Sequence, residues 1–368
     1  MNKKALIAMS GGVDSSVAAY LMTRQGYECM GVTMKLFDNE DVGIGSEKTC
    51  CSLKDMQDAS SVAYSLDMIY HVLNFSLDFK KEVIQRFVEA YQVGATPNPC
   101  IDCNRYIKFH KLLQRALMLE MDYLVTGHYA RIEYEEVTGR YLLKKAIDTT
   151  KDQTYFLYSM TQEQLAHTLF PLGNLHKTEI REIASKQGFV NAKKHDSQDI
   201  CFVKNGEYAQ FIEQYTDTSY EVGNFIDRHG NVLGCHKGII RYTVGQRRGL
   251  GLSFPHPMYV RSINVSDNTV TLCEEEWLYS KSLTTSDFNW IAFEYPSSPL
   301  KVKAKIRYKQ SEQSATVKQI SPEIVHVEFD EPQRAITKGQ AVVLYDGDVV
   351  LGGGTISDVL DYIPSQKE

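Results

Sequence analysis

The feature that most constrains this 368-residue chain is a glycine-rich turn, SGGVDSS at residues 10–16. It lies between a short apolar run, residues 5–9, and a helix-like run, residues 15–22. Adjacent glycines allow backbone torsions that other residues resist, and they let a phosphate approach the main chain. Free N–H groups and the helix dipole at a helix start attract an anion. Neither GxxxxGK[ST] nor GxGxxG fits these residues, so the turn predicts a nucleotide site of another class.

Polar side chains in the turn strengthen this prediction. The hydroxyls of Ser10, Ser15 and Ser16 could donate hydrogen bonds to phosphate. Asp14 has two interpretations, a partner of Mg²⁺ beside the phosphates or an N-terminal cap of the helix. The alternative for the whole segment is a glycine-rich connection that binds no ligand.

The pattern around the turn predicts an α/β fold with a parallel sheet. Strand candidates alternate with helix candidates in the first third of the chain, at residues 5–9, 15–22, 29–34, 52–66, 79–91 and 123–125. Strands that alternate with helices of about 10–15 residues are typical of parallel sheets. The ligand of such a sheet lies at the carboxyl ends of its strands.

The helical pattern becomes sparse after about residue 205. Short strand candidates separated by turn residues follow, at residues 232–242, 258–265, 269–273, 302–308, 314–320, 324–329 and 341–345. This spacing predicts antiparallel β domains or a barrel. We expect three domains, at residues 1–205, 206–280 and 281–368, which agrees with the domain count that the length favours.

Composition limits the location and the partners of the protein. No apolar run reaches the ~18 residues of a membrane helix, and the glycine turn interrupts the N-terminal apolar run too early for a secretory signal. The net charge of −6 argues against indiscriminate nucleic-acid binding, although it allows a local basic face. We expect a cytoplasmic protein without a membrane partner. Its eight cysteines should be mostly thiols there, and clustered ones indicate metal binding or catalysis.

Two segments place cysteines where a reactive thiolate is favoured. In TPNPCIDCN, residues 96–104, prolines stiffen a loop that precedes a helix-like stretch at residues 108–119. A thiol near a helix start is stabilised as thiolate. In KKHDSQDICF, residues 193–202, cations precede Cys201 and could favour its thiolate as well. A purely structural thiol is the alternative for Cys201.

The turn SGGVDS resembles the pyrophosphate loop of the ATP pyrophosphatase superfamily, whose members split ATP between the α and β phosphates and adenylate a substrate. The two cysteine segments resemble, more narrowly, the tRNA-specific 2-thiouridylase family, which thiolates the wobble uridine of tRNA. The likeness continues through DTTKDQTYFL at residues 148–157, HKGIIRYTVGQRRG at residues 236–249 and KGQAV at residues 338–342. It covers nearly the whole chain, and the combination of motifs is highly specific.

This resemblance implies an N-terminal ATP pyrophosphatase domain of the adenine nucleotide alpha hydrolase type, a small central domain and a C-terminal antiparallel β-barrel that contacts tRNA. It implies ATP and Mg²⁺ as cofactors, tRNA as substrate, and a cysteine desulfurase or sulfur-relay protein as the partner that delivers persulfide sulfur. The wobble uridine (U34) would be adenylated and then receive sulfur at C2, giving 2-thiouridine. Met34 could also be a core residue, but the implied ATP contacts are Ala8, Met9, Ser10, Gly11, Gly12, Val13, Asp14, Ser15, Met34 and Gly127, with Asp14 also in the catalytic set.

The same resemblance implies roles for two cysteines. Cys103 falls on the position of the nucleophile and Cys201 on the position of the cysteine persulfide, and a transient disulfide between them would accompany sulfur release. Some family members carry Asp where this chain has Cys100, so a role of that Asp does not transfer. An iron–sulfur cluster held by Cys100, Cys103 and Cys201 is an alternative. Cys50 and Cys51 are structural or of unknown role.

Five cations alternate with apolar residues between residues 301 and 309. On one strand they would share one face, which consists of Lys301, Lys303, Lys305, Arg307 and Lys309. RNA phosphates would relieve their mutual repulsion, and a solvated face is the alternative. Tyr308 could be a core residue by strand parity. The resemblance implies tRNA contacts at His128, Lys151, Asp152, Gln153, Arg307, Tyr308 and Gln340.

Two other functions compete with this interpretation. An adenylating ligase for a small metabolite would need neither Cys103 nor Cys201 and no basic face. A non-enzymatic RNA-binding protein would bind RNA without releasing pyrophosphate. Release of pyrophosphate that depends on tRNA, together with formation of 2-thiouridine, separates all three.

Overall fold

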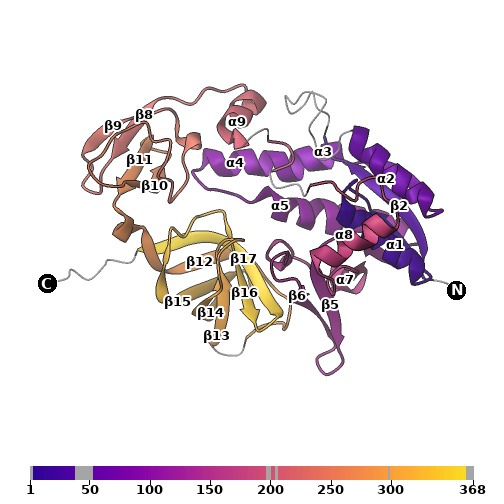
Figure 1. Cartoon of the computed structure of the whole chain (residues 1–368). Helices are drawn as coiled ribbons and strands as arrows, with labels where there is room; N and C mark the ends of the chain where they lie inside the picture. Colours follow the sequence, from indigo (N-terminus) through magenta and orange to yellow (C-terminus); the bar gives the residue numbers. More distant parts are fainter. Residues whose placement is uncertain (1–2, 38–52, 196–199, 204–205, 297–298, 362–368) are drawn as a thin grey trace.

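The computed structural model describes residues 3–37, 53–195, 200–203, 206–296 and 299–361. An N-terminal α/β part, a small β-sheet and a β-barrel follow one another along the chain (Figure 1). Cys50, Cys51 and residues 196–199 lie outside the described residues, so the predictions that involve them stay predictions.

A five-stranded parallel sheet organises the N-terminal part, in the order β3-β2-β1-β4-β7. Its strands are β1 (Lys4–Ala8), β2 (Glu28–Lys35), β3 (Ile69–Asn74), β4 (Tyr123–Val125) and β7 (Thr168–Leu169). The chain builds the sheet outward from β1 on one side through β2 and β3, and on the other side through β4. The carboxyl ends of β1 and β4 therefore border the crevice where such sheets bind ligands. The predicted parallel α/β class is confirmed.

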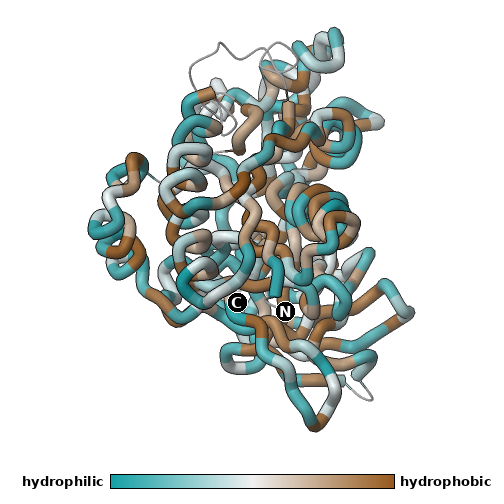
Figure 2. The backbone as a smooth tube through the Cα atoms, turned by 90° about the vertical axis from the view of Figure 1, so that its right-hand side faces the viewer, coloured by the Kyte–Doolittle hydropathy of each residue, from teal (hydrophilic) through white to brown (hydrophobic). Residues whose placement is uncertain are grey.

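The helices of this part cover the sheet. They are α1 (Val13–Arg24), α2 (Leu53–Ser65), α7 (Gln162–Ala166) and α8 (Lys177–Lys186), and two longer helical rods. One rod comprises α3 (Ser76–Phe79), η1 (Lys80–Gln85) and α4 (Arg86–Gln92), and the other α5 (Pro99–Asp102), η2 (Cys103–Leu112) and α6 (Leu113–Met118). Hydrophobic and hydrophilic colours alternate along the helical turns in Figure 2, as amphipathic helices require.

The second rod begins earlier than the sequence predicts. The apolar pattern predicts a helix from residue 108, but the helix starts at Pro99, whose fixed φ suits the first helical position. The side chain of Asn98 caps it by accepting a hydrogen bond from the backbone N–H of Cys100 at 3.2 Å. Both cysteines of the CxxC therefore lie on the first turns of a helix rather than in a loop.

The central part is a four-stranded sheet in the order β10-β11-β8-β9, preceded by α9 (Tyr208–Thr216). Its strands are β8 (Gly223–Ile226), β9 (Val232–His236), β10 (Tyr259–Asn264) and β11 (Thr269–Cys273). The strand expected over residues 232–242 is wrong beyond His236. Gly238 has φ 97°, and a short 3₁₀ turn, Ile239–Arg241, follows it.

The C-terminal part is a closed antiparallel barrel, as predicted. It consists of β12 (Tyr279–Trp290), β13 (Leu300–Lys305), β14 (Gln313–Ser321), β15 (Ile324–Arg334), β16 (Ala341–Asp346) and β17 (Val349–Asp361). Pairing of β12 with β17 closes it. A hairpin from the N-terminal part, β5 (Ala130–Glu135) and β6 (Arg140–Lys145), continues the same sheet where Lys144 pairs with Val349 (Figure 1).

Within the described residues, none of the helices combines the length and the apolar character that crossing a bilayer requires.

Candidate active site

The glycine turn connects the end of β1 to the start of α1, as predicted. Gly11 has φ 72°, and a Cβ there would lie 2.3 Å from the carbonyl oxygen of Asp55, so only glycine fits. Gly12 caps α1 with extended backbone, and no side chain caps this helix in the described part of the chain. The first N–H groups of α1 are therefore left to a ligand, which is the arrangement that binds anions.

Two of the three serines in the turn are buried and bonded to protein. Ser15 Oγ donates to the carbonyl of Gly12 at 3.0 Å and accepts from the N–H of Ser10 at 3.2 Å. Ser16 Oγ donates to the same carbonyl at 3.1 Å. These two hydroxyls shape the turn, whereas Ser10 is exposed, and its Oγ, 3.4 Å from Ser15 Oγ, is the one most open to a ligand.

Asp14 is held by side chains from distant parts of the chain. Lys177 Nζ donates to its two carboxylate oxygens at 2.7 and 2.8 Å, and the hydroxyl of Tyr129 donates to Oδ1 at 2.7 Å. The capping interpretation of Asp14 is wrong, because Gly12 is the N-cap and it has no side-chain cap bond. Sequence reasoning missed Lys177 and Tyr129, since no local pattern connects them to the turn.

Two residues of the segment that precedes Cys201 hold the glycine turn in place. Asn191 Nδ2 and Lys194 Nζ each donate to the carbonyl of Gly11 at 3.0 Å. Lys194 also binds the carboxylates of Asp55 and Asp58. Burial lowers the pKa of Lys194, but the two carboxylates outweigh this and leave the pKa raised. Lys194 therefore anchors the glycine turn. Its positive charge is paired with Asp55 and Asp58, so it is not the cation that favours a thiolate at Cys201.

The other expected ATP contacts gather at the carboxyl ends of the strands. Gly127 follows β4, and a Cβ there would lie 2.8 Å from the backbone nitrogen of Ser15, so glycine permits this close approach to α1. Met9 is buried at the end of β1, and its carbonyl accepts from Thr33 at 2.6 Å. Met34 lies at the end of β2, half-buried against the core. The fold thus places these residues at the carboxyl ends of neighbouring parallel strands.

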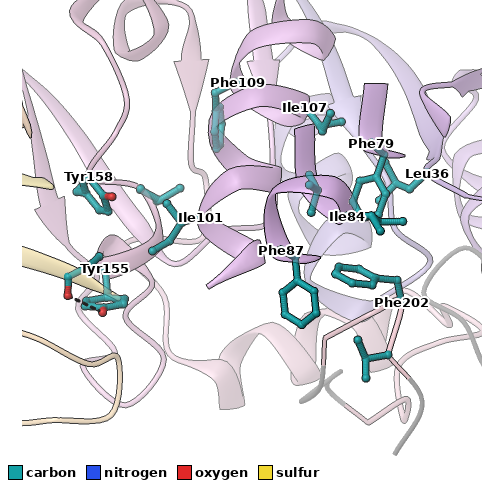
Figure 3. Packing of buried hydrophobic residues seen from close by; sticks show 14 of the residues in the cluster. Leu36, Phe79, Ile84, Phe87, Ile101, Ile107, Phe109, Tyr155, Tyr158 and Phe202 are labelled. Atoms are coloured by element: carbon teal, nitrogen blue, oxygen red, sulfur yellow. Dashed lines mark hydrogen bonds between the residues drawn. The ribbon is translucent and has the colours of Figure 1, made fainter. Parts of the chain in front are cut away.

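Both cysteine segments contribute to one large hydrophobic cluster that extends through all three parts of the chain. Cys103 and Cys201 are half-buried thiols that pack against the same hydrophobic cluster, and Cys100 is exposed. The ring of Phe202, next to Cys201, lies 5.3 Å from the ring of Phe87 and 5.7 Å from that of Phe79. Figure 3 shows these three rings near one another. In the part of the chain that the structure describes, no group of three or more His, Cys, Asp or Glu side chains is arranged to hold a metal ion. The iron–sulfur alternative thus gains no support from this geometry.

The predicted tRNA contacts of the N-terminal part include residues that hydrogen-bond to neighbouring loops. His128 accepts or donates a 2.6 Å hydrogen bond with Thr126, and burial holds the pKa of His128 well below its usual range, so its ring is neutral. Asp152 accepts from the N–H of Ala146, and Gln153 accepts from that of Tyr129. Lys151, in the same loop, is half-buried.

The predicted tRNA contacts of the barrel also bond to protein in this structure. Arg307 Nη2 donates to the carbonyl of Ala335 at 2.7 Å and to Thr337 Oγ1 at 3.1 Å. The ring of Tyr308 lies 4.4 Å from that of Phe156. Gln340 is equally engaged, because its Nε2 donates to the carbonyl of Thr96 at 2.7 Å.

The predicted basic face over residues 301–309 is wrong as one continuous strand. β13 ends at Lys305, and the N–H of Gln310 closes a turn onto the carbonyl of Arg307. Lys301 pairs with Asp330 at 3.0 Å, and Lys303 donates to Ser314 at 2.8 Å. Strand parity thus applies only up to residue 305, and Tyr308 is half-buried through its contact with Phe156.

Comparison with known proteins agrees with this arrangement. Family models described as the tRNA methyl transferase HUP domain, the tRNA methyl transferase PRC-barrel domain and the aminomethyltransferase beta-barrel domain match residues 3–205, 209–274 and 280–356. A protein of Clostridioides difficile (strain 630) named tRNA-specific 2-thiouridylase MnmA is 51% identical over 98% of this chain and 99% of its own length. A protein of the same name from Acetivibrio thermocellus is 50% identical over 96% of this chain and 99% of its own.

Among solved structures, a 4-thiouridine synthetase–RNA complex with bound ATP covers 58% of this chain and 50% of its own, with 18% identity and a TM-score of 0.34. With the two sequence relatives, by contrast, the chain shares about half of all residues over almost the full length of both proteins. The chain belongs to the tRNA-specific 2-thiouridylase family.

Proposed function

We propose that this chain is an ATP-dependent tRNA-uridine 2-sulfurtransferase of the cytoplasm that converts the wobble uridine (U34) of tRNA to 2-thiouridine. The observation that carries the proposal is the 51% identity, over nearly the whole length, with a relative named tRNA-specific 2-thiouridylase. The uncapped N-terminus of α1 supports it independently, because it offers backbone N–H groups to phosphate at the edge where a parallel sheet binds its ligand.

The first proposed step is adenylation of uridine. ATP places its phosphates at the N–H groups of Gly12, Val13 and the residues that follow, and Ser10 is exposed beside them. The uridine O2 attacks the α-phosphate, the bond to the β-phosphate breaks, and pyrophosphate leaves. Asp14 carries a carboxylate of the type that Mg²⁺ prefers, and Mg²⁺ bound there would neutralise phosphate charge. The product is an adenylated uridine whose oxygen now leaves readily as AMP.

The second proposed step is sulfur transfer. A desulfurase or relay partner loads Cys201 as a persulfide, and the terminal sulfur attacks C2 of the adenylated uridine. AMP leaves, and the Cys103 thiolate attacks the Sγ of Cys201, which breaks the sulfur–sulfur bond and releases 2-thiouridine. The resulting Cys103–Cys201 disulfide is then reduced by a cellular thiol.

The test combines two measurements on the full-length protein with ATP, Mg²⁺, a persulfide donor and unmodified tRNA. We expect pyrophosphate release that depends on tRNA, and 2-thiouridine in the digested tRNA. Pyrophosphate release that needs only a small metabolite would indicate a ligase. RNA binding without pyrophosphate release would indicate a binding protein, and either result would contradict the proposal.

A further inference from the structure

The C-terminal barrel holds the upstream end of the segment that carries Cys100 and Cys103. The N–H of Thr96 donates to the carbonyl of Lys338 at 2.9 Å, and Gln340 Nε2 donates to the carbonyl of Thr96 at 2.7 Å. Both polar groups of the Thr96 backbone are thus bound by one barrel loop. Gly339 permits this approach, because it has φ 86° and a Cβ there would lie 3.1 Å from the nitrogen of Thr96.

The barrel also holds the downstream end of the same segment. The guanidinium of Arg105 forms a two-pronged ion pair with Asp287 of β12, in which Nη2 lies 2.9 Å from Oδ1. Asp287 sits in a β-bulge with φ 56°, and a bulge directs a side chain away from its ordinary place on the strand. Planar two-pronged pairs fix orientation as well as distance. The bulge therefore directs Asp287 at the helix that begins with the CxxC.

A third contact reaches the residue next to Cys103. Asn104 is buried, and its Nδ2 donates to the carbonyl of Phe156 at 3.2 Å. The ring of Phe156 in turn contacts Tyr308 of the barrel. Residues on both sides of the two thiols are consequently attached to the barrel, directly or through one intermediate residue.

We propose that the barrel is the positioning element of Cys103, with Asp287 and Gln340 holding the segment from Thr96 to Arg105 at its two ends. This inference rests on the proposed role of Cys103 in sulfur transfer. Gln340, Tyr308 and Arg307 lie at or beside these contacts, so RNA that engages the barrel acts on the residues that place the thiol. A displacement of about 1 Å at a reacting group can reduce a rate by about 100-fold.

The test uses Asp287→Asn in the full-length protein. Asparagine tolerates the left-handed backbone of this position and keeps the side-chain size, but it removes the charge that binds Arg105. Asp330→Asn is the matched control, because it removes an aspartate that pairs with Lys301 within the barrel. Two readouts are taken, namely the rate at which iodoacetamide alkylates Cys103, measured by peptide mass spectrometry, and the kcat for each partial reaction.

We expect iodoacetamide to alkylate Cys103 about fivefold faster in Asp287→Asn than in wild type. The segment from Thr96 to Arg105 is then no longer held by Asp287, so it opens more often and exposes the thiol. Formation of 2-thiouridine should fall about tenfold in kcat, whereas tRNA-dependent pyrophosphate release and the KM for tRNA stay within about twofold. Asp330→Asn should match wild type in every measurement. Adding Arg105→Gln to Asp287→Asn should cause little further loss, since the pair is already broken.

Two outcomes would overturn the inference. One is wild-type alkylation and thiolation in Asp287→Asn. The other is an equal loss of pyrophosphate release and thiolation, which a general loss of stability would give. Failure of the proposed function is distinguishable, because a wild type that makes no 2-thiouridine would contradict that function, while the alkylation rates would still decide whether the barrel positions Cys103.

Discussion

Lys177 Nζ lies 2.7 and 2.8 Å from the two carboxylate oxygens of Asp14, which joins the start of α8 to the first turn of α1. The Lys177 side chain is only 11% exposed, so water screens this pair weakly. Lys177 thus compensates the charge of Asp14 next to the first N–H groups of α1. The ion pair therefore ties α8 to the glycine turn, and we expect it to support binding of the ATP phosphates there.

Lys177→Met should weaken ATP binding and also destabilise the fold. Breaking a largely buried pair leaves Asp14 uncompensated, which costs about 3 kcal/mol of unfolding free energy. The double variant Lys177→Met with Asp14→Asn should recover much of that stability but none of the ATP turnover. Urea unfolding and calorimetric ATP titration measure the two effects. If Lys177→Met bound ATP as wild type does, the assignment of Lys177 to the phosphate site would be wrong.

Gly12→Ala should abolish adenylation without disturbing the fold. The φ of Gly12 is −90°, which any residue adopts, and the nearest atom to an added Cβ is Ser10 Oγ at 3.4 Å. The new methyl group would occupy the side from which phosphate approaches, so pyrophosphate release should be lost while the melting temperature stays near that of wild type.

Gly11→Ala is the contrasting variant. Its positive φ and the 2.3 Å approach of Asp55 predict a clear loss of thermal stability. If a well-folded Gly12→Ala protein released pyrophosphate normally, the glycine turn would not be part of the ATP site.

The cysteines should act in separate steps. Cys201→Ser should accept no labelled sulfur from a donor, whereas Cys103→Ser should accept it and fail to transfer it. Both variants should still bind ATP, because neither residue lies in the glycine turn. Labelled sulfur on the protein and 2-thiouridine in tRNA are the readouts, and efficient thiolation by Cys201→Ser would refute the mechanism.

Cys100→Ser separates the persulfide relay from an iron–sulfur cluster. In a relay Cys100 is a bystander, so 2-thiouridine should still form in this variant. A three-cysteine cluster would instead lose activity, and the wild type prepared without oxygen would contain iron. Iron analysis of the anaerobic wild type is therefore the companion measurement.

The exposed cations of the barrel should act through RNA phosphates. Lys303 and Lys309 are exposed, whereas Arg307 supports the loop at Ala335 and Thr337, so replacing Arg307 would also disturb the structure. Lys303→Gln with Lys309→Gln should flatten the log–log salt dependence of tRNA binding by roughly 0.7–0.9 for each phosphate that no longer meets a cation. ATP affinity should not change. An unaltered salt slope would identify these lysines as a solvated surface.

Ionisation of the buried Asp102 carboxyl should lower the free energy of unfolding as pH rises. Burial raises the pKa of Asp102 to about 7, and Arg86 and Arg105 oppose the shift only in part. Because the folded pKa lies above the unfolded one of about 4, the folded state binds the extra proton between these values, and stability is lost as pH climbs from about 4 to 7. Asp102→Asn should remove this dependence, so urea midpoints at pH 5 and pH 8 should differ less than in wild type. Equal differences in both proteins would contradict the burial of this carboxyl.

The sequence by itself determined the class of fold and the family. The alternation of strand and helix, the double glycine before α1 and the cysteine motifs are local patterns, and each depends on residues within a few positions of one another. Helix and strand periodicities and the steric freedom of glycine operate over that same short range, which is why residues 5–9 and 123–125 could be recognised as strands next to a nucleotide site.

Only the tertiary structure decided what the individual side chains contact. The sequence pattern leaves Asp14 either to cap α1 or to face Mg²⁺, but Asp14 meets Lys177, which lies 163 residues away. Gln340 meets Thr96 across 244 residues, and Arg307, which lies just beyond the end of β13 at Lys305, meets Ala335. Contacts between residues so far apart arise when whole elements pack against each other, and no propensity within a short window encodes that packing.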